Sequence, residues 1–325
     1  MTSNNASTGT DPAIRLSAVS KSYGEKVAVR DLDLAVPEGS VYGLLGPNGA
    51  GKSTTIRMIL DIIAPDRGEV EIFGSSDVIG ARPHIGYLPE ERGLYAKMKV
   101  AEHLAYLAVL KGVDRRLAMA AARKGLDRVG LGDRADDKVE SLSKGMAQKA
   151  QMLSCLLHEP RLLILDEPFS GLDPLNVEMF KELIRERRAA GATVLFSTHM
   201  IEDAERLCDR VCMIAGSRKV LDGRVADVKA AQGQRDVAVQ YEGDGTFLRA
   251  PGLVQRVADQ GHYAEIRLEE GADAQDLLRR AVEQGVRLSR FEIINPSLRQ
   301  IFIEKATEVG LSAEDESEDE AGAPR

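Results

Sequence analysis

The feature that most constrains the fold of this chain is a glycine-rich loop between a predicted strand and a predicted helix. The apolar run 41–45 precedes the loop, and a segment of helical character over 54–60 follows it. The loop itself reads Gly46-Pro47-Asn48-Gly49-Ala50-Gly51-Lys52-Ser53. Glycines let such a backbone curl so that successive N–H groups point at phosphate oxygens, and the positive end of the next helix faces the same place. The setting therefore predicts a site for a nucleoside triphosphate with magnesium.

Individual residues of this loop have predicted roles. Lys52 is placed to neutralise the β- and γ-phosphates, and the Ser53 hydroxyl to ligate Mg²⁺. The bare pattern arises by chance in roughly one chain in a hundred of this length, so its surroundings matter. The residues expected to contact the nucleotide are Gly46, Pro47, Asn48, Gly49, Ala50, Gly51, Lys52, Ser53 and Thr54.

A second apolar run supports this interpretation. Residues 162–165 do not alternate between apolar and polar, so they predict a strand buried on both faces of a parallel sheet. The run ends in Asp166-Glu167-Pro168, and ligands of open α/β sheets bind at the carboxyl ends of strands. Asp166 is predicted to hold magnesium, directly or through water, and Glu167 to activate an attacking water. The alternative is a simple polar turn, because Pro168 ends the strand in either case.

A serine-rich turn over 141–146 leads into an amphipathic stretch over 147–158. Ser143 is predicted to cap that helix, and a capped helix start with a flexible glycine, here Gly145, favours anion binding. An ordinary helix cap is the alternative.

Five motifs in a fixed order then identify a family. Residues 14 to about 223 resemble the ATP-binding subunit of an ABC transporter. The motifs are the phosphate loop, the Leu-Ser-x-Gly signature at 142–145, the strand ending in Asp166-Glu167, the turn Ser-Gly-Leu-Asp-Pro at 170–174, and Thr198-His199 after the apolar strand 193–196. The resemblance implies ATP and Mg²⁺ as cofactors and ATP hydrolysis as the activity.

The resemblance also implies roles for single residues. Tyr23 matches the aromatic residue that stacks on adenine, with packing in an edge strand as the alternative. His199 matches the residue that contacts the γ-phosphate and the catalytic water, and Asp173 matches an aspartate that couples two subunits. Ser143 and Gly145 match signature residues that bind the γ-phosphate of ATP held by the opposite subunit. The family's hydrolysis then needs a head-to-tail dimer, expected here as a homodimer, with ATP at its seam.

The chain departs from the family pattern at three positions. Glu90 stands where the family usually has glutamine, and Lys144 and Met146 replace glycine and glutamine of the signature. A carboxylate at position 90 either meets Mg²⁺ or pairs with a neighbour such as Arg92. The run Pro-Glu-Glu-Arg-Gly-Leu-Tyr at 89–95, together with Ser-Lys-Gly-Met, resembles the sodium- and drug-efflux branch. The expected metal ligands are Ser53, Glu90 and Asp166.

Composition limits the partners and the location of the chain. A net charge of −8 and an aromatic content of 4% argue against a nucleic-acid-binding protein. No apolar stretch approaches the roughly 20 residues of a membrane helix, and the polar residues 1–10 do not resemble a signal peptide. The chain is therefore expected to be cytoplasmic and peripheral at the membrane, with an integral membrane permease as its partner.

Three cysteines, Cys155, Cys208 and Cys212, fit a reducing compartment. Cys208 and Cys212 have the spacing of a metal-binding pair on one helix. No further His or Cys nearby completes a set of four ligands, so both are predicted to pack in the interior.

A length of 325 residues allows more than one domain. The expected fold is α/β: a P-loop ABC ATPase core with a helical lobe, plus a small C-terminal α+β appendage. Strand patterns at 237–241 and 262–268 and a helix pattern at 274–284 define that appendage. The predicted ranges are a disordered start at 1–12, the ATPase domain at 13–224 with its helical lobe at about 94–138, the appendage at 225–306, and an acidic disordered tail at 307–325.

These features predict an ATP-binding and ATP-hydrolysing subunit of an ABC-type exporter that drives a separate permease through ATP-dependent dimerisation. The permease is expected to dock between the core and the lobe, where Leu94, Tyr95 and Met98 are apolar or aromatic. One rival is a soluble ABC ATPase acting on ribosomes or DNA, which usually has two cassettes, a long coiled-coil insertion or zinc-type cysteine clusters. Another rival is a non-hydrolysing regulator, against which Glu167 and His199 argue.

Overall fold

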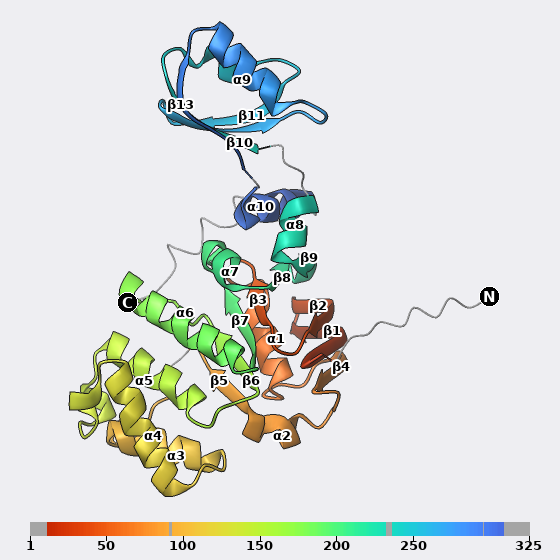
Figure 1. Ribbon diagram of the computed structural model, residues 1–325. Helices are drawn as coiled ribbons and strands as arrows, with labels where there is room; N and C mark the ends of the chain where they lie inside the picture. The colour runs from red at the N-terminus through yellow and green to blue at the C-terminus, as the bar shows by residue number, and fades with distance from the viewer. Residues whose placement is uncertain (1–11, 91–92, 232–235, 295, 309–325) are drawn as a thin grey trace. The chain divides into compact units, whose positions relative to one another are not determined.

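A computed structural model describes residues 12–90, 93–231, 236–294 and 296–308 (Figure 1). The chain forms two compact units, residues 1–223 with 305–325 and residues 224–304. Arg92 and nearly all of the predicted disordered ends, 1–12 and 307–325, lie outside the described residues. Within the described ranges, no helix combines the length and the apolar character needed to span a membrane.

A six-stranded sheet forms the centre of the first unit (Figure 1). Its strands, in spatial order, are β5 (Ile85–Leu88), β6 (Leu162–Asp166), β7 (Thr193–Thr198), β3 (Val41–Leu45), β8 (Arg210–Ala215) and β9 (Arg218–Arg224). β5, β6, β7, β3 and β8 are parallel to one another. Every residue of β3 and β6 is buried, which explains why neither run alternates in sequence. The predicted α/β core with a parallel sheet is confirmed.

The carboxyl ends of β3, β6 and β7 meet at one edge of this sheet. In the strand register, Asp166 pairs with Ser197 and Leu45 pairs with Thr198. The helices that follow these three strands are α1 (Lys52–Ile59), α6 (Pro174–Ala189) and α7 (Ile201–Leu207). The polar residues after each strand are therefore brought together although they are far apart in the sequence.

An antiparallel sheet of three strands packs beside this core. Its order is β2 (Lys26–Val36), β1 (Ile14–Tyr23) and β4 (Arg67–Ile72). Ile14 and Leu32 of this sheet share one buried cluster with Leu44 of β3 and Ile56 of α1. Tyr23 ends β1 and lies opposite Lys26 across the hairpin, which places it near the start of the phosphate loop.

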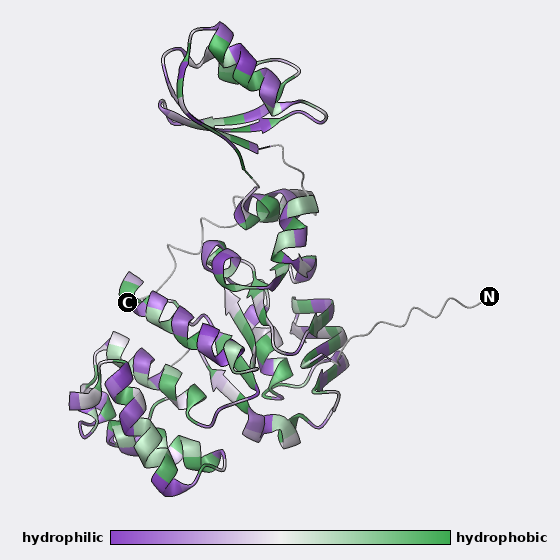
Figure 2. Cartoon of the chain, viewed as in Figure 1, coloured by the Kyte–Doolittle hydropathy of each residue, from purple (hydrophilic) through white to green (hydrophobic). Residues whose placement is uncertain are grey.

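Helices cover the sheet and build a lobe beside it. In α6 the buried Phe180, Leu183 and Ile184 follow helical spacing, and the helix also carries many hydrophilic residues (Figure 2). The lobe contains α3 (Val100–Leu110), α4 (Arg115–Arg128) and α5 (Lys144–Leu156). Ala150 and Leu153 of α5 belong to the same buried cluster as α3 and α4, so this cluster extends beyond the predicted range of 94–138. Short elements complete the unit: α2 (Val78–Ala81) and the 3₁₀ turns Arg82–His84, Gly132–Arg134 and Val139–Ser141.

The second unit contains an antiparallel four-stranded sheet. The strand order is β11 (Val254–Asp259), β12 (Tyr263–Leu268), β10 (Asp236–Glu242) and β13 (Arg287–Ile294). α9 (Ala274–Glu283) packs on one face of this sheet through Leu277 and Ala281, which contact the cluster around Val237 and Val239. The other elements are α8 (Val225–Ala231), the 3₁₀ turn Gly245–Arg249 and, up to Glu304, α10 (Leu298–Glu308). Two strands and one helix match the predicted patterns, whereas β11 and β13 were not predicted.

Candidate nucleotide-binding and catalytic site

The backbone of the phosphate loop requires glycine at two positions. Gly46 and Gly51 have φ angles of +155° and +108°. A Cβ at Gly46 would lie 2.2 Å from the carbonyl oxygen of Ile214, and one at Gly51 would lie 2.2 Å from that of Ala28. Neither contact is possible for a residue with a side chain. The curl of the loop is therefore fixed by close approach to β8 and β2.

Lys52 lies at the centre of the site and is almost fully buried, with 5% of its surface exposed. Its ammonium donates to the carbonyl oxygens of Gly46 (2.8 Å) and Pro47 (3.1 Å). The same nitrogen lies 3.3 Å from Oε1 of Glu167 in an ion pair. Since both charges are buried, each depends on the other. The predicted phosphate-binding lysine and the predicted base are thus in direct contact.

Ser53 and Asp166 form a second contact at the same edge. The Ser53 hydroxyl donates to Oδ1 of Asp166 at 3.1 Å, and the Ser197 hydroxyl donates to the same oxygen at 2.5 Å. A hydroxyl beside a carboxylate is an oxygen-donor set that suits Mg²⁺, which usually takes one or two protein ligands and completes its shell with phosphates and water. The residues present therefore fit the metal expected with ATP.

Glu167 has an unusual backbone conformation. Its φ is +48°, in the left-handed region that residues with a Cβ rarely adopt. The Glu167 N–H donates to the Ser197 hydroxyl at 3.1 Å, and Nδ1 of His199 lies 3.0 Å from Glu167 Oε2. An ionised carboxylate can only accept, so Nδ1 is the donor and Nε2 is left as an acceptor. The structure brings Lys52, Glu167 and His199 into one chain of contacts.

Ser197 was not predicted to belong to the site. Its hydroxyl holds the Asp166 side chain and the Glu167 backbone at once. The only sequence signal is a polar residue at the end of the apolar strand 193–196, and its partners lie about thirty positions away. The register of β6 against β7 has to be known before this role can be seen.

Two pockets adjoin these residues, and Glu90 and Glu167 line both of them. The first, of about 400 Å³, lies around the phosphate loop, and we refer to it as the nucleotide pocket. The residues that line it are Tyr23, Lys26, Ala28, Asn48, Gly49, Gly51, Lys52, Ser53, Thr54, Glu90 and Glu167. The second, of about 370 Å³, lies between the ends of β5 and β6 and the start of α5. Tyr23 is half exposed, and Glu90 is exposed.

The signature residues lie at the start of α5. Ser143 caps the helix as predicted, and its hydroxyl accepts from the Met146 N–H at 3.4 Å. A Cβ at Gly145 would meet nothing within 4 Å, so the packing of this chain does not require glycine there. Neither Ser143 nor Gly145 is among the described residues that line the nucleotide pocket of the same chain.

Asp173 caps another helix, α6, at the end of the loop that follows Glu167. Its carboxylate accepts from the Asn176 N–H at 3.0 Å and also from the Asn176 side-chain amide. The backbone hydrogen bond from Asn176 is the largest of the effects that lower the pKa of Asp173. Asp173 is exposed, so it has a local structural role and remains accessible.

The residues of the expected docking segment differ in exposure. Tyr95 is 55% exposed, whereas Leu94 and Met98 are partly buried, and Leu94 packs against the helical cluster. The Tyr95 ring makes edge contacts with His103 and Tyr106, with ring centroids 5.4 and 6.2 Å apart. Tyr95 is thus the accessible member of the predicted group.

The cysteines are packed rather than arranged as a metal site. Cys208 ends α7 and Cys212 lies on β8, so they do not share a helix. Burial raises the pKa of both thiols. Among the described residues, no cluster of three or more His, Cys, Asp or Glu is placed to hold a metal ion.

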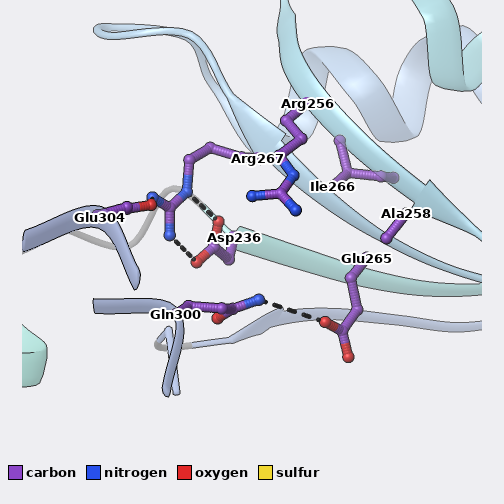
Figure 3. A pocket seen from close by; sticks show the side chains of 8 residues that line it. All are labelled: Asp236, Arg256, Ala258, Glu265, Ile266, Arg267, Gln300 and Glu304. Atoms are coloured by element: carbon purple, nitrogen blue, oxygen red, sulfur yellow. Dashed lines mark hydrogen bonds and ion pairs between the residues drawn. The ribbon is translucent and has the colours of Figure 1, made fainter. Parts of the chain in front are cut away.

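A further small pocket lies in the second unit, between the sheet and α10 (Figure 3). Its charged groups are largely paired with each other. Asp236 accepts two hydrogen bonds of 2.7 Å from Arg267, which also pairs with Glu304 of α10. Glu265 accepts from Tyr263 and Gln300. These contacts hold α10 against β10 and β12, which explains the charged groups without a ligand.

Comparison with known proteins agrees with this geometry. Residues 29–170 match the family model described as "ABC transporter", and residues 223–306 match that of the "ATP-binding protein DrrA1-3-like, C-terminal domain". The uncharacterized ABC transporter ATP-binding protein YhaQ of Bacillus subtilis is 40% identical over 88% of this chain and 96% of its own. The linearmycin resistance ATP-binding protein LnrL of the same species is 32% identical over 88% of this chain and 95% of its own.

A solved structure described as an ATP-binding subunit of an ABC transporter is also similar. It superimposes with a TM-score of 0.64 at 33% identity, covering 68% of this chain and 93% of its own. The predicted family resemblance and the P-loop ABC ATPase fold are therefore confirmed. The chain belongs to the ABC transporter ATP-binding proteins, and it is an ATP-binding ATPase subunit of that family.

Proposed function

We propose that this chain hydrolyses MgATP to drive a separate membrane permease in an ABC-type exporter. The observation that carries the proposal is the contact chain from Lys52 through Glu167 to His199, set beside the Ser53–Asp166 pair. A phosphate-binding cation, a metal-binding carboxylate and a base are thereby assembled at one edge of the sheet.

The roles of the residues follow from this placement. Lys52 neutralises the β- and γ-phosphates, while the loop N–H groups from Gly46 to Ser53 hold them. Ser53 and Asp166 would hold Mg²⁺, and the metal supplies charge neutralisation at the transferring phosphoryl group. Glu90, on the wall of both pockets, is placed to contact the metal or its water. Tyr23, half exposed in the nucleotide pocket, would stack on adenine.

Glu167 would accept the proton of the attacking water. His199 donates through Nδ1 to Glu167, and its Nε2 would accept a hydrogen bond from the attacking water and so orient it. Once phosphate occupies the site, its charge competes with Glu167 for Lys52, which frees the carboxylate to act as a base. The buried Lys52–Glu167 ion pair therefore holds both side chains in place before ATP binds.

We infer further that two copies of the chain sandwich ATP head to tail. Gly145 is not required by the packing of its own chain, since a Cβ there would meet nothing within 4 Å. Close approach of a nucleotide on a second copy would explain this glycine. Ser143 lies at the same helix start, and Asp173 lies exposed at the end of the loop after Glu167, where it would couple the two sites.

The exporter assignment is supported by the relatives. LnrL is named for linearmycin resistance. A Bradyrhizobium diazoefficiens protein that is 40% identical over 65% of this chain is named for Nod factor export. No described helix is suited to spanning a membrane. In the proposed exporter, a separate integral membrane permease would carry the transported solute and would hold the chain at the cytoplasmic face. The proposed domains are an ATPase domain at 13–224 and an appendage at 225–306.

Gel filtration of Glu167→Gln tests the dimer. The variant should elute as a monomer with ADP and as a dimer with MgATP, because the sandwich opens only after hydrolysis. Gly145→Asp in the same background is the matched control, since it adds a charge at the interface without touching the chain's own pocket. A monomer under all conditions for Glu167→Gln would contradict the head-to-tail sandwich.

A further inference from the structure

Gln148, on the first turns of α5, reaches across to the loop that follows Glu167. Its side-chain amide nitrogen donates to the carbonyl oxygens of Pro168 at 3.2 Å and Ser170 at 3.1 Å. Both acceptors are backbone groups, so the contact fixes the path of the loop rather than one of its side chains. Gln148 lines the second pocket and is not among the residues of the nucleotide pocket.

This loop begins with a conformation that has to be held in place. A left-handed Glu167 is unfavourable and persists only where the surroundings over-determine it. On the upstream side, β6 and the Ser197 hydroxyl fix the residue. Within the turn, the Ser170 N–H donates to the Glu167 carbonyl oxygen at 3.2 Å. Gln148 adds an anchor on the downstream side, from a different part of the chain.

Lys144 lies one helical turn before Gln148, on the same face of α5. Its ammonium lies over Gly171, 3.2 Å from where a Cβ at that glycine would be placed. Gly171 has a φ of +70°, so the loop makes its sharp bend directly beneath Lys144. Two successive positions of the helix thus cover the loop from Pro168 to Gly171.

We propose that Gln148 is a positioning residue that clamps the loop 168–171 and so keeps the Glu167 carboxylate aligned with Lys52 and His199. Because Gln148 and Ser143 are on one helix, the clamp also ties the start of the signature helix to the hydrolytic site of the same chain. A movement of α5 then shifts the loop and, with it, Glu167 and Asp173. The catalytic part of this proposal rests on the proposed role of Glu167.

The test compares Gln148→Met with Lys149→Met in the full-length chain. Methionine keeps the length of the side chain and removes both hydrogen bonds to the loop. Lys149 is the matched control, because it donates to a backbone carbonyl of the lobe, Val129, at 3.3 Å and not to the site. Gln148→Met should lower kcat roughly tenfold, the rate equivalent of about one hydrogen bond, and leave the Kd for MgATP within about twofold. Lys149→Met should leave both values unchanged.

Hydrogen exchange of the backbone amides at 169–173 supplies a readout that does not depend on the rate of hydrolysis. Exchange should be faster in Gln148→Met than in the parent chain and unchanged in Lys149→Met. Unchanged exchange in Gln148→Met, or an equal loss of kcat in both variants, would overturn the clamp. If Glu167→Gln still turns over ATP, the base assignment fails. Faster exchange in Gln148→Met would then still support the clamp itself.

Discussion

Lys52 has two kinds of partner, the loop carbonyls of Gly46 and Pro47 and the carboxylate of Glu167. Because the lysine and the glutamate are both buried, removing either leaves a charge without its partner. Residues at this site therefore contribute to folding stability as well as to ligand binding. Substitutions have to be compared with variants that separate the two effects.

Lys52→Ala removes the cation that we propose neutralises the β- and γ-phosphates. A hydrogen bond to a charged group contributes about 1.5–3 kcal/mol, so the Kd for MgATP should rise at least roughly tenfold. Equilibrium titration with a fluorescent ATP analogue measures this change. The control is the double variant Lys52→Ala/Glu167→Gln. It also removes the Glu167 charge that Lys52→Ala leaves without a partner, so it should recover folding stability but not the affinity for MgATP. Unchanged affinity in Lys52→Ala would show that the loop amides hold the nucleotide unaided.

Glu90→Gln removes a negative charge from the wall of the nucleotide pocket. The side chain is exposed, so water weakens its repulsion of the triphosphate to less than about 1 kcal/mol. The variant should support hydrolysis and bind MgATP roughly two- to fivefold more tightly. Glu140→Gln, an exposed change in the lobe, serves as the control. A folded but inactive Glu90→Gln would reveal a charge-dependent role of this carboxylate.

At the level of secondary-structure elements, α5 joins the lobe to the core and begins with the signature. Cys155 contacts the carbonyl of Tyr87 through its thiol at 2.9 Å, and His158, just after the helix, contacts the carbonyl of Ile85 at 3.1 Å. Both acceptors are on β5, which leads directly to Glu90. These contacts fix the C-terminal end of the helix to β5, while Gln148 ties its first turns to the loop after Glu167.

Elements with a regular pattern could be predicted, and those at sheet edges could not. The buried strands β3, β6 and β7 and the helix α5 follow from their apolar spacing and from the Ser143 cap. β11 and β13 are edge strands with mostly exposed residues, so neither shows the alternation that a half-buried strand would have. Ser197 and Gln148 make hydrogen bonds to residues that are distant in the sequence. Such contacts depend on strand register and on how the helix packs against the core, so they could not be predicted from local patterns.

His158 should make the stability of the chain sensitive to acid. Burial lowers the pKa of His158 from 6.5 to about 4. The unfolded chain binds the proton between these pH values and the folded chain does not, so the free energy of unfolding falls as pH drops from about 6.5 to 4. His158→Gln keeps a donor for Ile85 and removes this titration. Urea unfolding at pH 7.5 and 5 should show a smaller loss for the variant, while an equal loss would contradict this role.

The whole molecule consists of two units with separate cores, the ATPase unit and the sheet with α9. All motifs recognised in the sequence lie in the first unit, because each is a local pattern of a loop and its flanking strand or helix. The described residues of the second unit contain no such loop, and its charged pocket is explained by internal pairing. The sequence could therefore predict the existence of this unit but not its function.

Tyr95→Glu tests contact with a permease. The ring is exposed beside α3, and a charge there should oppose the docking of an apolar partner. The tagged chain should co-purify from membranes with an integral membrane protein, and Tyr95→Glu should lower the yield of that protein at least roughly tenfold. Leu117→Glu, another exposed apolar position of the lobe, is the control. Recovery of ribosomal or DNA-repair components without a membrane protein would favour a soluble ABC ATPase instead.

The role of Glu167 as the base is tested by the steady-state rate of MgATP hydrolysis by Glu167→Gln compared with that of the parent chain. Glutamine preserves the shape of the residue and removes its ability to accept a proton. The rate should fall by roughly 10²–10⁴, while the Kd for MgATP stays within a few-fold of the parent value. Near-normal turnover in Glu167→Gln would contradict the assignment of Glu167 as the base and, with it, the proposed mechanism of hydrolysis.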